Sequence, residues 1–178
     1  MSLLPIITLP DPVLRQKSTL IERVDDELRR TLDDMLETMY DAPGVGLAAN
    51  QVNIAKRFIV VDAGNGRDDE DDDDQEEVRN PLCLINPEIV SRGDALRSYE
   101  EGCLSLPDVR VEIERPDTIT VRYLDRDGAQ QELNAEGFLA TVIQHEVDHL
   151  DGKLIIDFLS SLRRDMIVRR LKKLARLA

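Results

Sequence analysis

The hydrophobic positions of this chain first recur with the period of a helix. Between Asp25 and Tyr40, apolar side chains are spaced three and four residues apart, at Leu28, Leu32, Met35, Leu36 and Met39. This spacing predicts an amphipathic helix, which Pro43 and Gly44 would end. A second helix is predicted from about Gly137 to Leu150, with a glycine two residues later as its stop.

Short apolar or β-branched runs predict strands between and after these helices. They lie at Phe58 to Val61, Leu82 to Ile85 and Ile119 to Leu124. Asp127-Gly128 marks a turn before a further run at Gln130 to Leu133. We interpret these runs as strands of a mostly antiparallel sheet, so the helices and strands together predict an α+β fold.

The end of the chain, residues 160–178, predicts a basic helix. Ser160 or Ser161 can cap it, and one of its sides carries Ile167, Leu171, Leu174 and Ala178. Seven bases and one acid lie in this segment. Bases near a helix carboxyl terminus complement the macrodipole, but seven exceed that need, so this helix is a candidate docking surface.

Length and composition favour one domain over residues 1–178. The chain has 42% hydrophobic residues and a formal net charge of -13, and nine of its acids lie within residues 68–77. We interpret that segment as a solvated surface loop insertion. The chain has two cysteines, no basic leader and no apolar run that could cross a bilayer, which predicts a cytoplasmic protein.

The predicted second helix carries the pattern His145-Glu146-Val147-Asp148-His149. A spacing of four residues puts both imidazoles on one helix face, where they can bind one cation. The intervening Glu146 can then act as general base and general acid. The pattern alone is moderately specific and can arise by chance. It gains weight because His145 and His149 are the only histidines of the chain.

A hydrolytic metal site needs a third protein ligand and an open position. No third histidine exists, and the downstream stretch Asp151 to Phe158 offers only Asp151 and Asp157. Cys103 is the better candidate, because it lies among acids, a glycine and a proline rather than in an apolar run. Cys83 lies within such a run and is interpreted as a buried core residue.

Three motifs resemble those of the bacterial-type peptide deformylases. They are Gly44-Val45-Gly46-Leu47-Ala48-Ala49-Asn50-Gln51, Glu101-Gly102-Cys103-Leu104-Ser105 and His145-Glu146-Val147-Asp148-His149-Leu150-Asp151-Gly152. Their order and spacing fit the family, and the similarity runs from Pro10 to the carboxyl-terminal helix. The resemblance implies that Cys103, His145 and His149 hold the metal and that Glu146 is the acid/base.

The resemblance also implies how the substrate is held. The Gln51 amide and the backbone N-H of Leu104 would donate hydrogen bonds to the formyl oxygen, Gly46 would pair with the substrate backbone, and Arg110 would contact the substrate. The pocket positions for the first side chain, methionine, are occupied by Val45, Phe138 and Val142. Core packing is the alternative interpretation of these three. Relatives often carry aliphatic residues where this chain has Tyr99 and Thr141.

The activity implied by the resemblance is removal of the N-formyl group from the amino-terminal formylmethionine of nascent polypeptides, with release of formate. It also implies one divalent metal ion, natively Fe2+, with Zn2+, Ni2+ or Co2+ able to substitute, a monomer, and docking of the last helix on the ribosome. Two alternatives use the same residues. A zincin-type endopeptidase would cut internal peptide bonds, and a noncatalytic metal-stabilised binding protein would leave Glu146 without a role.

Overall fold

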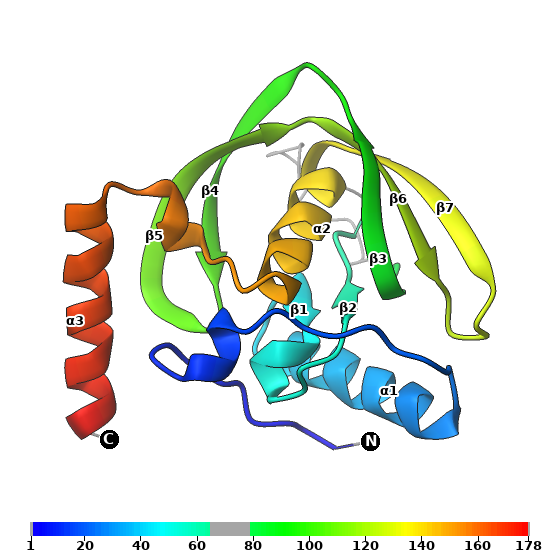
Figure 1. The fold of residues 1–178 in the computed structure, drawn as a ribbon, viewed down its shortest axis with the longest axis horizontal. Coiled ribbons are helices and arrows are strands. Elements are labelled where there is room, and N and C mark those ends of the chain that lie inside the picture. Colours follow the sequence, from blue (N-terminus) through cyan, green and yellow to red (C-terminus); the bar gives the residue numbers. More distant parts are fainter. Residues whose placement is uncertain (1, 65–78, 178) are drawn as a thin grey trace, which may run out of the picture.

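The computed structural model describes residues 2–64 and 79–177. The predicted acidic loop, residues 68–77, lies outside them. The described part confirms the α+β prediction, with helices interspersed among antiparallel strands (Figure 1). The α-helices are α1 (Asp26–Asp41), α2 (Gly137–Leu150) and α3 (Ser161–Leu177).

The strands form two antiparallel sheets. The larger sheet has the order β1-β2-β3-β6-β7, built from β1 (Gly46–Ala48), β2 (Phe58–Val61), β3 (Leu82–Arg92), β6 (Thr118–Leu124) and β7 (Gln130–Glu136). The smaller sheet pairs β4 (Leu96–Cys103) with β5 (Leu106–Pro116). Short 3-10 turns join these elements: η1 (Pro12–Arg15), η2 (Ala49–Val52) and η3 (Ile155–Phe158).

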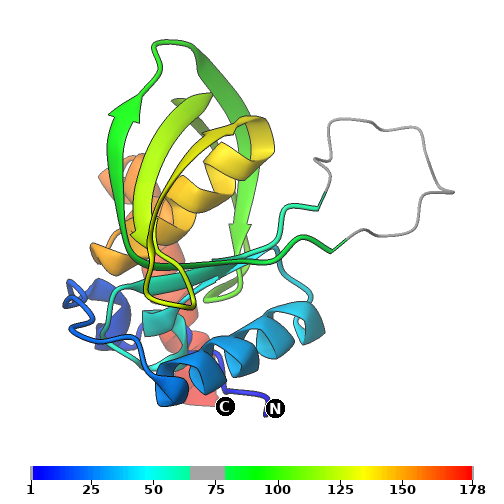
Figure 2. The same ribbon diagram turned by 90° about the vertical axis from the view of Figure 1, so that its right-hand side faces the viewer.

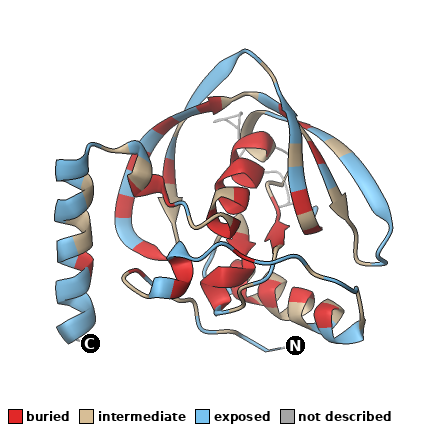
Figure 3. Ribbon diagram, in the orientation of Figure 1, coloured by how far each residue is buried: buried red, intermediate tan, exposed pale blue. Residues whose placement is uncertain are grey.

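Helix α2 runs through the middle of the molecule, with the β4-β5 sheet on one side and the larger sheet on the other (Figure 1). Nearly all of its residues from Ala140 to His149 are buried (Figure 3). Its apolar side chains, such as Val142 and Ile143, pack against Ile59 and Val121 of the larger sheet. A helix that is buried on most sides can shield polar side chains from water, as a catalytic or metal-binding site requires.

Helix α1 covers the opposite face of β1 and β2. Asp25 caps it by accepting a hydrogen bond from the N-H of Leu28 at 2.9 Å. Its buried Met35 and Met39 pack with Phe58 of β2, and Figure 2 shows the helix along the base of the fold. Because both faces of β2 are covered, its sequence is continuously apolar rather than alternating.

The structure differs from the sequence expectations in two places. The β4-β5 hairpin was not predicted, and β3 continues past Ile85 to Arg92. On the apolar side of α3, Leu171 is buried and Leu174 is 52% exposed, so this side is only partly covered. Ala178 lies outside the described residues.

Helix α3 begins after a serine cap, as the sequence predicted. The hydroxyl of Ser160 accepts a hydrogen bond from the N-H of Arg163 at 3.3 Å, so Ser160 caps α3. Among the described residues, no helix combines the length and apolar character that a membrane span requires.

Candidate metal centre

Three side chains from two elements converge beside the middle of the molecule. Cys103 ends β4, and His145 and His149 lie one helical turn apart on α2. Their possible ligand atoms all lie within 4.8 Å of one another. The Sγ of Cys103 is 3.2 Å from Nε2 of His149. Both histidines are buried and the cysteine is half-buried, so the cluster is shielded from solvent on most sides.

Local structure explains why Cys103 faces the helix. The β4-β5 register is regular from Leu96 to Gly102 and shifts between Gly102 and Cys103, which then pairs with Leu106. Such an irregularity bends a strand and re-aims the next side chain. The two histidines meet the cysteine because residues four apart share a helix face.

The residues of this cluster fit a divalent metal. One thiol and two imidazoles form a donor set suited to Zn2+ and similar ions. Burial lowers the pKa of His149 well below its ordinary value, so its ring is neutral, which is the form that binds metals. Burial lowers the pKa of His145, but Cys103, Glu101 and Glu146 together raise it by more, so the net shift is upward. The surroundings of the His145 ring therefore favour a positive charge at this place.

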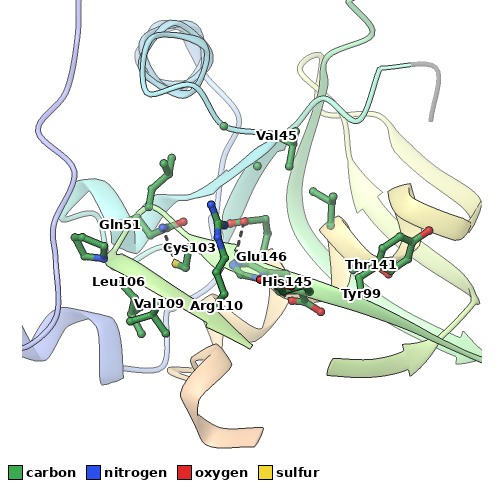
Figure 4. Close-up of a pocket in the computed structure, with 18 of the residues that line it drawn as sticks. Val45, Gln51, Tyr99, Cys103, Leu106, Val109, Arg110, Thr141, His145 and Glu146 are labelled. Atoms are coloured by element: carbon green, nitrogen blue, oxygen red, sulfur yellow. Dashed lines mark hydrogen bonds and ion pairs between the residues drawn. The ribbon is translucent and has the colours of Figure 1, made fainter. Parts of the chain in front are cut away.

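Glu146 projects from α2 beside the cluster (Figure 4). Its Oε1 lies 3.7 Å from Nε2 of His145, and among the described residues its buried Oε2 has no hydrogen-bond partner. Burial raises the pKa of Glu146 to about 7. A carboxylate with this pKa is well matched to accept and return a proton near neutral pH. A nearby cation would favour its charged form and counter this shift.

The amide of Gln51 is oriented by three contacts. Its Oε1 accepts a hydrogen bond from the N-H of Ala48 at 2.9 Å, and its Nε2 donates to Oγ of Ser105 at 3.0 Å. The same Nε2 lies 3.6 Å from Sγ of Cys103 (Figure 4). The donor end of the amide therefore points toward the cluster.

A buried ion-pair network supports the first histidine. Oε1 of Glu101 lies 2.9 Å from Nδ1 of His145. Arg115 binds the same carboxylate through Nε at 2.7 Å and Nη2 at 3.0 Å, and it binds Asp148 through Nη1 at 2.8 Å. Although burial disfavours its charge, bonds to His145 and Arg115 hold the pKa of Glu101 below its ordinary value. Glu101 therefore orients the histidine directly, and Asp148 acts through the arginine.

Sequence reasoning missed Arg115, which lies among charged residues of β5. The signal was nevertheless present, because inward positions of β5 alternate with exposed ones. Val109, Val111 and Ile113 are buried, and Arg115 is the next position of the same parity. A charged residue at a predicted core position calls for a buried partner of opposite charge.

A cavity of about 770 Å³ opens onto the cluster. All five residues predicted to contact substrate line it, namely Val45, Gly46, Arg110, Phe138 and Val142. Tyr99 and Thr141 line it too, and the ring centroids of Tyr99 and Phe138 are 5.6 Å apart. The guanidinium of Arg110 lies over Gly102 and occupies the space that a side chain at this glycine would need.

Comparison with known proteins decides the family. The family model described as "Polypeptide deformylase" matches residues 3–165. The chain belongs to this family. Peptide deformylase from Agrobacterium fabrum is 52% identical over 176 residues, covering 99% of this chain and 98% of that protein. The Rhizobium meliloti peptide deformylase is also 52% identical, covering 99% and 96%.

Solved structures of the family share the fold. The crystal structure of the Ehrlichia chaffeensis peptide deformylase in complex with actinonin has a TM-score of 0.86 and 40% identity, covering 97% of this chain and 98% of that one. The Thermotoga maritima enzyme has a TM-score of 0.80 and 43% identity, covering 90% and 99%.

Membership establishes the reaction. Peptide deformylases are metal-dependent hydrolases that act on formylated nascent peptides, and the cysteine and two histidines of this chain form a cluster that can bind a metal. The structure thus brings together every residue that the sequence suggested for the site.

Proposed function

We propose that Cys103, His145 and His149 hold one divalent metal ion and that Glu146 transfers the proton during deformylation. The observation that carries this proposal is the convergence of three ligand atoms within 4.8 Å beside a buried carboxylate oxygen that lacks a hydrogen-bond partner among the described residues. A metal held there would act as a Lewis acid and lower the pKa of a water molecule towards about 7.

The side chains of the site have separate tasks in this proposal. Glu146 accepts a proton from the attacking water and then gives it to the leaving amino nitrogen. Nε2 of Gln51 and the backbone N-H of Leu104 donate hydrogen bonds to the formyl oxygen as it gains negative charge. Removing one such donor reduces transition-state stabilisation by about 2.7 to 4 kcal/mol.

The cavity orients the substrate. Strand β1 is the edge of the larger sheet, so Gly46 can pair with an extended peptide backbone. Arg110 would contact the substrate peptide beyond its first residue. The methionine side chain would lie against Val45, Phe138 and Val142, which line the cavity.

The proposed native metal is Fe2+, with Zn2+, Ni2+ or Co2+ as substitutes. Thiolate and imidazole ligands accept all four ions, so the support for iron comes from the family resemblance. Anaerobic purification followed by metal analysis tests this assignment, and a protein isolated with zinc alone from iron-replete cells would contradict it.

The proposed roles can be tested by formate release from formyl-Met-Ala-Ser. Wild type and Glu146→Gln are purified anaerobically and their metal contents measured. The proposal predicts rapid release by wild type, and a loss of release in the variant while metal is retained. Full activity of Glu146→Gln would contradict the acid/base assignment. Cleavage of unformylated peptides at internal bonds would point instead to an endopeptidase.

We also propose that the protein is a cytoplasmic monomer whose helix α3 docks on ribosomal RNA phosphates near the peptide exit. The support is the basic surface of α3, whose Lys172, Lys173 and Arg176 are all exposed. Reversing these three charges to glutamate should weaken co-sedimentation with ribosomes.

The matched control reverses three exposed bases elsewhere, at Lys17, Arg23 and Arg92. It changes the net charge equally and should retain more ribosome binding. Equal loss in both variants would contradict a specific role for α3.

A further inference from the structure

The two histidines of the cluster are held in different ways. Nδ1 of His145 lies 2.9 Å from Glu101. Nδ1 of His149 is buried, and within residues 2–64 and 79–177 it has no hydrogen-bond partner. Because a bond to the second ring nitrogen normally fixes the orientation of a metal-binding histidine, His149 needs another source of order.

Asn50 supplies a contact to the backbone of this histidine. Its side chain is completely buried, and its Nδ2 donates a hydrogen bond to the carbonyl of His149 at 2.6 Å. That carbonyl lies in the last turn of α2, where backbone oxygens lack partners within the helix. It also accepts a bond from the N-H of Gly152 at 3.0 Å. Asn50 therefore anchors the last turn of α2, which carries His149, through a side-chain hydrogen bond.

The position of Asn50 connects this turn to a second part of the site. Asn50 lies in η2 immediately before Gln51, and all four residues of that short turn are buried. Nε2 of Gln51 in turn lies 3.6 Å from Sγ of Cys103. One amide thus joins the turn that carries the hydrogen-bond donor Gln51 to the turn that carries His149.

Only one end of the Asn50 amide is used. Among the described groups, its buried Oδ1 has no hydrogen-bond partner. A buried amide oxygen without a partner is unfavourable, so packing alone would favour an apolar residue of similar size. The contribution of Asn50 is therefore its N-H donor, directed at His149.

We propose that Asn50 is a positioning residue that holds His149 and Gln51 in their working arrangement. This inference rests on the proposed function, in which His149 is a metal ligand and Gln51 a donor to the formyl oxygen. Asn50 acts through these two residues.

The test is Asn50→Leu, which keeps the branching of the side chain at Cγ and removes both polar ends of the amide. The carbonyl of His149 retains its bond from Gly152, so folding should be little affected. We expect Zn2+ binding, measured by competition with a chromophoric chelator, to weaken on the order of tenfold. We also expect an altered absorption spectrum of the Co2+-loaded protein, and a lower kcat with little change in KM.

Val52→Ala is the matched control. Val52 is a buried residue of the same turn and packs in the cluster around α1. Its truncation should lower the free energy of unfolding without changing Zn2+ affinity or the Co2+ spectrum. Should Asn50→Leu fail to fold, Asn50→Ala provides the same readouts.

Wild-type Zn2+ affinity and Co2+ spectrum in a folded Asn50 variant would overturn the proposal. Equal losses in Val52→Ala would overturn it as well, because the effect would then be general loosening of the turn. Failure of the proposed function is distinguishable, since Cys103→Ala would then keep full metal and full activity whatever Asn50 does to metal binding.

Discussion

The carboxylate of Glu101 lies 2.9 Å from Nδ1 of His145 and accepts hydrogen bonds from two nitrogens of Arg115. A carboxylate in this position fixes the ring and leaves Nε2 free to face the cluster. The side chains of Glu101 and Arg115 are each only 6% exposed. Removing Arg115 leaves Glu101 as a buried carboxylate that keeps, among the described residues, only its contact with His145.

Arg115→Met should therefore destabilise the protein strongly. Breaking a buried ion pair from one side typically costs about 3 to 5 kcal/mol. Urea unfolding measures this change. Arg122→Met is the control, because the pair of Arg122 with Glu132 is more than half exposed and such pairs contribute about 0 to 1 kcal/mol. Similar losses in both variants would contradict the importance of the buried network.

Gly46→Ala should lower kcat by displacing Glu146. A Cβ at this glycine would lie 2.9 Å from Cγ and from Oε1 of Glu146, so the carboxylate would have to move. Formate release with saturating substrate is the measurement. Gly93→Ala introduces a close contact with the side chain of Thr118, away from the cavity lining, and should retain kcat. An unimpaired Gly46→Ala enzyme would show that Glu146 need not occupy its observed position.

Tyr99→Leu should widen the range of first side chains that are accepted. Tyr99 lines the cavity and its ring contacts Phe138, so a smaller side chain leaves more room there. We expect a higher ratio of kcat/KM for formyl-Phe-Ala-Ser relative to formyl-Met-Ala-Ser. Tyr123→Leu, outside the cavity lining, should leave the ratio unchanged. The same ratio in both variants would argue against Tyr99 as a pocket wall.

The ion pair of Asp157 with Arg15 makes stability depend on pH in the acid range. Burial alone would raise the pKa of Asp157, but bonds from Arg15 and from the N-H of Leu154 hold it below its ordinary value. A lowered folded pKa means that this stabilisation is present above the unfolded value of about 3.9 and is lost as pH falls through the folded value.

Asp157→Asn tests this linkage through urea unfolding at several pH values. The stability difference between wild type and variant should be constant near neutral pH and should shrink as the pH falls below about 4. A difference that grows with acidification would contradict the sign of the shift.

Local patterns predicted much of the fold and the ligand cluster. The spacing of His145 and His149 requires only one helix, and α2 has the predicted bounds. Strand β2 likewise has the predicted bounds, because a short apolar run needs no distant information to be recognised. Cys103 was found from its unusual neighbours and from the family resemblance, although it lies on a strand that was not predicted.

Features that depend on distant partners were missed. The β4-β5 hairpin carries many charged residues on its exposed face, which hid its inward alternation. Asn50 gave no local signal, because its partner, the carbonyl of His149, lies 99 residues away. Such contacts become visible only when the fold brings the two segments together.

The most direct test of the ligand assignment compares Cys103→Ala with Cys83→Ala. Both variants lose one thiol, but only Cys103 belongs to the cluster, whereas Cys83 packs in the core around α1. Metal content and formate release are measured on both proteins after anaerobic purification. The account predicts that Cys103→Ala loses metal and activity while Cys83→Ala keeps its metal. Full metal and full activity in Cys103→Ala would contradict it.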